Sequence, residues 1–194
     1  VEGKTNFFEK PISMEDLSYL LKDGKIIGVV QDRHELGPRA LGNRSILCDP
    51  SIPDMKDILN SKVKFREWYR PFAPMCRKED AHIYFLSSTF DNMEFMSFTA
   101  TVKPEYREKL KAITHVDNSA RLQTVTENTN KFIYDLLGYV DGVLLNTSFN
   151  VQGEPTLNRL DKAFYMLEKT QLDGFVIVED DKTIHLYSRD ELFQ

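Results

Sequence analysis

The segment KIIGVVQDRHELGPRALGNRS, residues 25–45, joins a short apolar run to a stretch rich in fixed positive charge. Its first seven residues are mostly β-branched and apolar, which predicts a buried strand. The stretch that follows contains Arg33, His34, Arg39 and Arg44, and its glycines and proline prevent a single helix. We therefore expect these cations to lie in a loop that leaves the end of a strand.

Helix and strand signals alternate through the rest of the chain. Ser13 and Asp16 form a capping pattern before an apolar run, which predicts a helix that ends near Gly24. Further helices are expected from about Asp54 and over residues 104–113, 128–140 (ending near Gly138) and 160–171, and further strands over 94–102 and 142–150. Residues 174–180 and 182–187 read as a hairpin over Asp180-Asp181. This mixture predicts one α/β (α+β) domain over residues 1–194 with a mixed, twisted sheet.

Composition excludes several classes of protein. The formal net charge is −5, so a general attraction to nucleic acid or to an anionic membrane is not expected, and any anion site must be a local cluster. No apolar run approaches the roughly 18–20 residues that span a bilayer, and the first residues show no signal-peptide pattern, so we expect a cytoplasmic protein. The two cysteines, Cys48 and Cys76, have no metal-binding spacing and indicate reduced thiols.

Polar residues suited to anions gather in four separate segments. Guanidinium groups match phosphate or carboxylate oxygens with two parallel hydrogen bonds, and cations among aromatic rings suit a nucleotide. The segments are GPRALGNRS with Arg39 and Arg44; KVKFREWYRPFAP with Lys62, Lys64, Arg66, Arg70, Trp68, Tyr69 and Phe72; THVDNSARLQTV with His115, Asp117 and Arg121; and LLNTSFNVQGEP with Asn146, Thr147, Ser148 and Asn150.

Familiar nucleotide and hydrolase motifs are missing from the sequence. There is no GxxxxGK[ST], GxGxxG, HExxH or GxSxG, so the four segments favour one pocket built from distant parts of the chain. From the residues alone we expect a phosphate- or nucleotide-binding enzyme domain. The structural alternative is that the arginines are surface residues and that Arg39 and Arg44 only tie their loop to Asp49 or Glu35.

Four motifs in order resemble the carboxy-terminal domain of the carbamoyltransferase family, which includes nodulation-factor and antibiotic O-carbamoyltransferases. They are GPRALGNRSIL with DP and IPDMKD, FREWYRPFAPM, THVDNSARLQTV and VLLNTSFNVQGEPT, and the resemblance runs from about Lys22 to Val178. One departure is Asp32-Arg33, where the family commonly has Gly-Arg.

The resemblance implies a YrdC-like fold, a twisted open sheet with flanking helices around a basic cavity. It also implies that the domain forms carbamoyl adenylate from carbamoyl phosphate and ATP, with Mg²⁺ on the nucleotide. A separate actin-like ATPase-fold domain, in cis or in trans, would transfer the carbamoyl group. That domain carries an iron-binding histidine pair, and no HxxxH occurs here.

Motif matching carries the family's site residues onto this chain. The implied catalytic contacts are Arg39, Lys64, Arg70 and Arg121, and the implied nucleotide and phosphate contacts are Asn146, Thr147, Ser148, Asn150, Arg44 and His115. No metal site is implied within the chain. The alternative function is a non-catalytic nucleotide- or RNA-binding module of the same fold, although the acidic net charge makes nucleic acid a poor partner.

Overall fold

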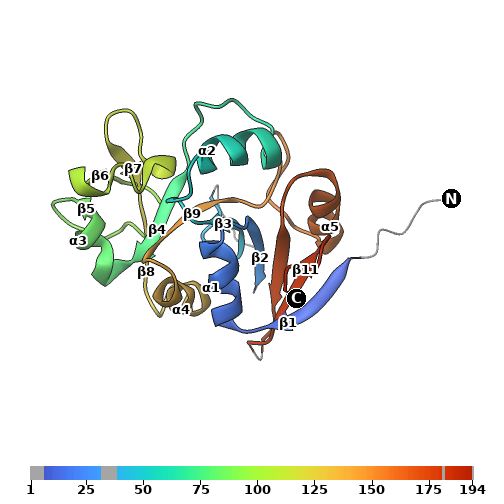
Figure 1. The fold of residues 1–194 in the computed structure, drawn as a ribbon. Coiled ribbons are helices and arrows are strands. Elements are labelled where there is room, and N and C mark those ends of the chain that lie inside the picture. The colour runs from blue at the N-terminus through green and yellow to red at the C-terminus, as the bar shows by residue number, and fades with distance from the viewer. Residues whose placement is uncertain (1–6, 32–38, 181, 194) are drawn as a thin grey trace.

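The computed structural model describes residues 7–31, 39–180 and 182–193. In this part of the chain, eight strands form one sheet and three short strands form a second (Figure 1). The large sheet has the order β1-β11-β10-β2-β3-β9-β4-β8. Its strands are β1 (Phe8–Ile12), β2 (Ile27–Gln31), β3 (Arg44–Cys48), β4 (Ala73–Arg77), β8 (Gln123–Val125), β9 (Val143–Ser148), β10 (Gly174–Val178) and β11 (Ile184–Ser188).

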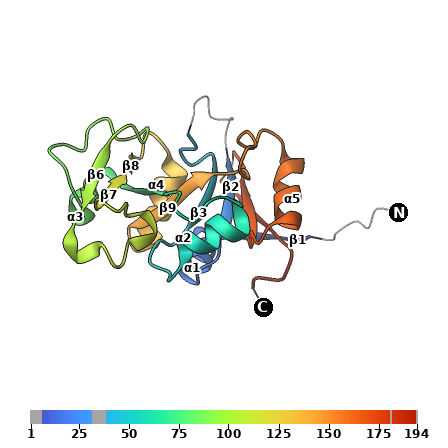
Figure 2. The same cartoon turned by 90° about the horizontal axis from the view of Figure 1, so that it is seen from above.

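The large sheet is mixed. β10 and β2 pair in parallel, as do β4 and β8, and the other neighbours pair antiparallel. The small sheet contains β5 (Phe85–Leu86), β6 (Thr99–Val102) and β7 (Ser119–Arg121) in antiparallel order. It lies at one end of the molecule, with α5 at the other (Figure 2).

Helices cover both faces of the large sheet (Figure 1). One face packs on α1 (Met14–Lys22) and α4 (Lys131–Tyr139), and the other on α2 (Met55–Ile58), the π-helical turn η1 (Leu59–Val63) and α5 (Leu160–Lys169). Strand alternation assigns the side chains: in β3, Leu47 faces α1 and α4, whereas Ile46 and Cys48 face the opposite core. The shorter helical turns are η2 (Lys78–Asp80), α3 (Ala81–Tyr84), η3 (Pro104–Tyr106) and η4 (Lys111–Ile113).

Strong local signals predicted their elements correctly. The Ser13 hydroxyl accepts from the Asp16 amide at 3.0 Å and the Asp16 carboxylate accepts from the Ser13 amide at 2.9 Å, so the expected capping box begins α1. The buried strand after residue 25 is β2, the strand before Asn150 is β9, and β10 and β11 form the expected hairpin. The mixed α/β class is confirmed.

Two expectations were wrong. Residues 104–113 do not form one helix, because the chain bends at Leu110 (φ −106°, ψ 28°) and brings Leu110, Ala112 and Ile113 together into the core. Arg44 does not lie in a loop but begins β3. It pairs with Val30 of β2, and the pairing of β3 with β9 begins at the next residue, Ser45. The expected strand over 94–102 is shortened to β6.

Candidate functional site

The four polar segments meet in one cavity of about 330 Å³ at the ends of β4, β7 and β9. We call it the arginine pocket. Its described lining consists of Arg39, Ala40, Arg66, Arg70, Pro71, Phe72, Ala73, Met96, Arg121, Asn146, Thr147 and Ser148. The predicted assembly of a single pocket from distant segments therefore agrees with the geometry.

The arginine pocket is strongly electropositive. Four guanidinium groups belong to its described lining and no carboxylate does, although the whole chain is acidic. Burial lowers the pKa of Arg66 to about 10, with further contributions from Arg70 and Arg121. Burial also lowers the pKa of Arg121, and nearby Arg39 adds to this effect. An anionic ligand would relieve this repulsion between like charges.

Asn60 organises the arginine-bearing loop between η1 and β4. It is buried at 1% exposure and its amide nitrogen donates to the Trp68 and Arg70 carbonyls at 3.2 Å each. Its amide oxygen accepts from Arg66 Nε at 2.7 Å, and the Arg66 guanidinium lies 4.4 Å from the centre of the Phe72 ring. These contacts fix the direction of the Arg66 side chain before any ligand arrives.

A chain of amide groups connects the pocket floor to the segment that carries Arg39. Asn146 Nδ2 donates to the Ala40 carbonyl at 2.9 Å and to Gln123 Oε1 at 2.8 Å. Gln123 Nε2 in turn donates to the Leu41 carbonyl at 2.9 Å. Strands β8 and β9 thus hold the backbone beside Arg39 in place.

Lys64 lies beneath the turn that follows β9. Its ammonium is 2.7 Å from the carbonyl oxygens of both Ser148 and Asn150, 2.6 Å from Asn150 Oδ1 and 3.3 Å from Ser148 Oγ. The side chain is only 2% exposed. Lys64 therefore fixes the shape of this turn, and its direct contact with a ligand stays a prediction.

The charge of Lys64 provides a pH-dependent test. Burial, with a smaller effect of Arg66, lowers its pKa from 10.5 to about 7, so between these values the unfolded chain binds more protons than the folded chain. The free energy of unfolding should then rise with pH by up to about 5 kcal/mol relative to Lys64→Met. Urea unfolding of both proteins between pH 6 and 10 measures this difference. A constant difference would mean that the four oxygens keep Lys64 charged throughout.

The remaining predicted residues occupy different places. Thr147 and Ser148 line the pocket. Asn150 faces Lys64 and donates to the Glu154 carbonyl at 2.7 Å, and His115 lies 3.2 Å from Ser119 Oγ, outside the pocket lining. Arg44 is also outside that lining and donates to the carbonyls of Gln31 (2.5 Å) and Asn43 (2.9 Å), which indicates a structural role.

Sequence reasoning named Arg66 among the cations suited to a nucleotide but gave it no site role, and it passed over two residues that organise the site, Asn60 and Gln123. Arg66 and Gln123 were inside the recognised motifs, but nothing in the motif spacing showed that Arg66 would line the pocket or that Gln123 would accept a hydrogen bond from Asn146. Asn60 follows an apolar residue in a predicted helix, and only its burial distinguishes it from a surface amide.

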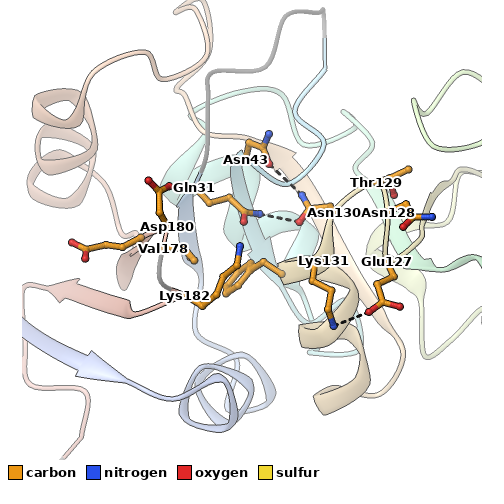
Figure 3. Close-up of a pocket in the computed structure, with 12 residues that line it drawn as sticks. Gln31, Asn43, Glu127, Asn128, Thr129, Asn130, Lys131, Val178, Asp180 and Lys182 are labelled. Atoms are coloured by element: carbon orange, nitrogen blue, oxygen red, sulfur yellow. Dashed lines mark hydrogen bonds and ion pairs between the residues drawn. The ribbon is translucent and has the colours of Figure 1, made fainter.

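A second cavity of about 340 Å³ lies near the start of α4 and the β10–β11 turn (Figure 3). Gln31 Nε2 donates to Asn130 Oδ1 at 3.1 Å, and Asn130 Nδ2 to Asn43 Oδ1 at 3.2 Å. Its described lining mixes carboxylates with lysines, including Glu127 and Lys131, which are paired at 3.1 Å. Unlike the arginine pocket, it therefore has no single sign of charge.

The match to a protein-family model shows to which family this chain belongs. The model of the carbamoyltransferase C-terminus matches residues 18–181. The chain belongs to this family. It is 45% identical over 163 residues to nodulation protein NolNO of Sinorhizobium fredii, a match that covers 81% of this chain and 24% of that protein. It is 40% identical over 172 residues to 3'-hydroxymethylcephem-O-carbamoyltransferase of Streptomyces clavuligerus, covering 86% and 32%. The chain thus spans about a quarter to a third of the length of these curated relatives.

Solved structures confirm the YrdC-like fold. The chain superposes on full-length HypF in its phosphate- and nucleotide-bound form with a TM-score of 0.61 at 17% identity, covering 89% of this chain and 24% of HypF. It superposes on a Sua5 variant of P. abyssi with a TM-score of 0.53 at 7% identity, covering 88% and 51%. At such identities the likeness concerns the fold.

No helix among residues 7–31, 39–180 and 182–193 has the length and apolar character needed to cross a bilayer. Within the same ranges, no three histidine, cysteine or acidic side chains gather closely enough to hold a metal ion.

Proposed function

We propose that this domain forms carbamoyl adenylate in the arginine pocket. Carbamoyl phosphate and water would give carbamate and phosphate, and a carbamate oxygen would attack the α-phosphorus of ATP and displace pyrophosphate. The observation that carries the proposal is the gathering of four arginines, without a carboxylate in the described lining, in one cavity. Two polyanionic reactants need such a site because their mutual repulsion must be neutralised before they can meet.

The arginines would act by binding and alignment. The Arg66 and Arg121 side chains are half-buried, where charge–charge interactions are stronger than in water, and Arg39 and Arg70 complete the wall. Holding two reactants in line contributes roughly 7–11 kcal/mol to lowering a barrier. Mg²⁺ would bind chiefly to phosphate oxygens and water, which suits a pocket that offers cations instead of carboxylates.

The relatives support this proposal. The Streptomyces clavuligerus protein is named as an O-carbamoyltransferase, and the HypF structure is described as phosphate- and nucleotide-bound. The chain covers about a third or less of these proteins. We therefore propose that an actin-like ATPase-fold domain, in cis or in trans, passes the carbamoyl group from the adenylate to an acceptor hydroxyl.

The test is release of pyrophosphate from ATP by the purified chain. We expect release that requires both carbamoyl phosphate and Mg²⁺, and formation of carbamoyl adenylate in equal amount by mass spectrometry. ATP binding without pyrophosphate release under any of these conditions would contradict catalysis and favour a binding module.

Substitution of Arg70 tests the place of the nucleotide. Arg70→Ala should weaken Mg-ATP binding roughly 10- to 150-fold, because a charge-assisted phosphate contact contributes about 1.5–3 kcal/mol. Isothermal titration calorimetry measures the change. The matched control is Arg159→Ala, which removes an exposed arginine that pairs with Asp161 at 3.2 Å outside the pocket. If the Arg70 variant and the wild type bind Mg-ATP with equal affinity, the nucleotide does not contact Arg70.

A further inference from the structure

A residue with left-handed backbone geometry lies between two cations of the site. The helical turn η1 is capped at Lys64 (φ −87°, ψ −24°), and Phe65 follows with a φ of 51°. Glycine usually occupies such a position after a helix, because a side chain at positive φ is strained, most of all a bulky one. Phe65 is 55% exposed, so burial of its ring offsets little of this strain. A strained residue beside a pocket indicates a backbone turn that the site needs.

The turn at Phe65 places its two neighbours in different walls of the site. The Lys64 ammonium lies beneath the turn after β9, whereas Arg66 lines the arginine pocket. The Lys64 amide donates to the Leu59 carbonyl at 2.8 Å, and the Arg66 amide donates to the Asn60 carbonyl at 2.9 Å. Both bonds reach back into η1, so the backbone at Arg66 is fixed by the end of this helical turn.

Asn60 holds the Arg66 side chain as well as its backbone. Its side-chain oxygen accepts from Arg66 Nε at 2.7 Å, and the guanidinium lies 4.4 Å from the centre of the Phe72 ring. Asn60 is 1% exposed and its side-chain nitrogen donates to two carbonyls of the same loop, so its own orientation is fixed. A guanidinium held in this way can bind an anion without first losing the freedom of a long side chain.

We propose that Asn60 and the backbone turn at Phe65 together position Arg66 for anion binding. This inference rests on the proposed function and adds two positioning residues, neither of which belongs to the described lining of the arginine pocket. Glycine in place of Phe65 relieves the backbone strain but allows the turn more conformations. The melting temperature and the affinity for an anion should therefore change in opposite directions, which a residue needed only for stability does not produce.

The experiment measures binding of inorganic pyrophosphate to the purified chain by titration calorimetry. Phe65→Gly should bind it roughly 2- to 12-fold more weakly, the usual effect of ordering one long side chain on binding, and should melt at or above the wild-type temperature. Phe65→Ala is the matched control, because it removes the ring but keeps a Cβ on the strained turn, and its affinity should stay within about twofold of the wild type. Asn60→Ala should weaken binding at least as much as Phe65→Gly.

A double-variant cycle shows whether the effect passes through Arg66. In an Arg66→Ala background, Phe65→Gly should alter the affinity for pyrophosphate by less than about twofold, because the side chain that the turn positions is gone. A loss of affinity of the same size in both backgrounds would overturn the inference.

The remaining outcomes separate this inference from the proposed function. Wild-type affinity in Phe65→Gly or in a folded Asn60→Ala, or an equal loss of affinity in Phe65→Ala, would overturn the inference and leave the proposed function standing. So would a Phe65→Gly protein that melts at a lower temperature and binds more weakly. If the wild type binds no pyrophosphate, the arginine pocket is not an anion site, and the proposed function fails together with the inference. The Phe65 cycle needs no Asn60 variant, so poor folding of Asn60→Ala cannot protect the inference.

Discussion

Lys64→Met is expected to lower pyrophosphate release about 100-fold while the chain stays folded. Methionine has similar length but cannot donate to the Ser148 and Asn150 carbonyls, which Lys64 contacts at 2.7 Å. The turn after β9 then loses its central tie and Ser148 moves in the pocket wall, where a displacement of about 1 Å can cost 100-fold in rate. The free energy of unfolding should change less than the free energy of activation. Removing a buried ammonium is favourable and offsets the loss of its hydrogen bonds.

The matched control for this prediction is Lys62→Met, two residues away on an exposed position. It should keep the rate of pyrophosphate release within about twofold of the wild type. Circular dichroism of both variants establishes the folded fraction, to which each rate is normalised. Wild-type activity in a fully folded Lys64→Met protein would show that the turn keeps its shape without the ammonium and that Lys64 has no role in the site.

Gly28→Ala is expected to destabilise the fold by about 1–3 kcal/mol, the usual cost of overpacking a core. An added Cβ would lie 2.4 and 2.5 Å from two ring carbons of Phe149 and 3.0 Å from Phe175 Cβ. Both rings are fully buried and 6.2 Å apart between centres, so neither can retreat into solvent. For a chain of this size the melting temperature should fall by roughly 2–12 °C.

Gly138→Ala is the control for the loss of stability expected in Gly28→Ala. Gly138 is exposed in α4, and the three atoms nearest to an added Cβ belong to the Arg77 guanidinium, which donates from Nε to the Tyr134 carbonyl at 2.8 Å and would have to shift. Alanine is about 1 kcal/mol better than glycine within a helix, which offsets the shift of Arg77, so this variant should melt close to the wild-type temperature. An unchanged melting temperature for Gly28→Ala would mean that the two rings repack freely. Because Phe149 separates Ser148 from Asn150, a destabilised Gly28 variant should also show weaker phosphate binding.

The sequence by itself determined the features that depend on neighbouring residues. The Ser13–Asp16 capping box, the apolar run of β2 and the period of α4 and α5 need only contacts within a few positions, so their patterns predicted the elements. The four motifs also predicted the family, which the family comparison confirmed.

Only the tertiary structure decided how the site residues are used. Lys64 and Ser148 are 84 residues apart in the chain, and Asn146 and Ala40 are 106 apart, so no local pattern encodes their hydrogen bonds. The same holds for Arg44, whose place in β3 follows from pairing with β2 and β9. Residue type shows whether a side chain can donate or accept a hydrogen bond. Burial and distant partners determine which of its atoms remains available to a ligand. Asn146 shows this physical reason most directly, because both of its donors are used within the protein, on the Ala40 carbonyl and on Gln123 Oε1.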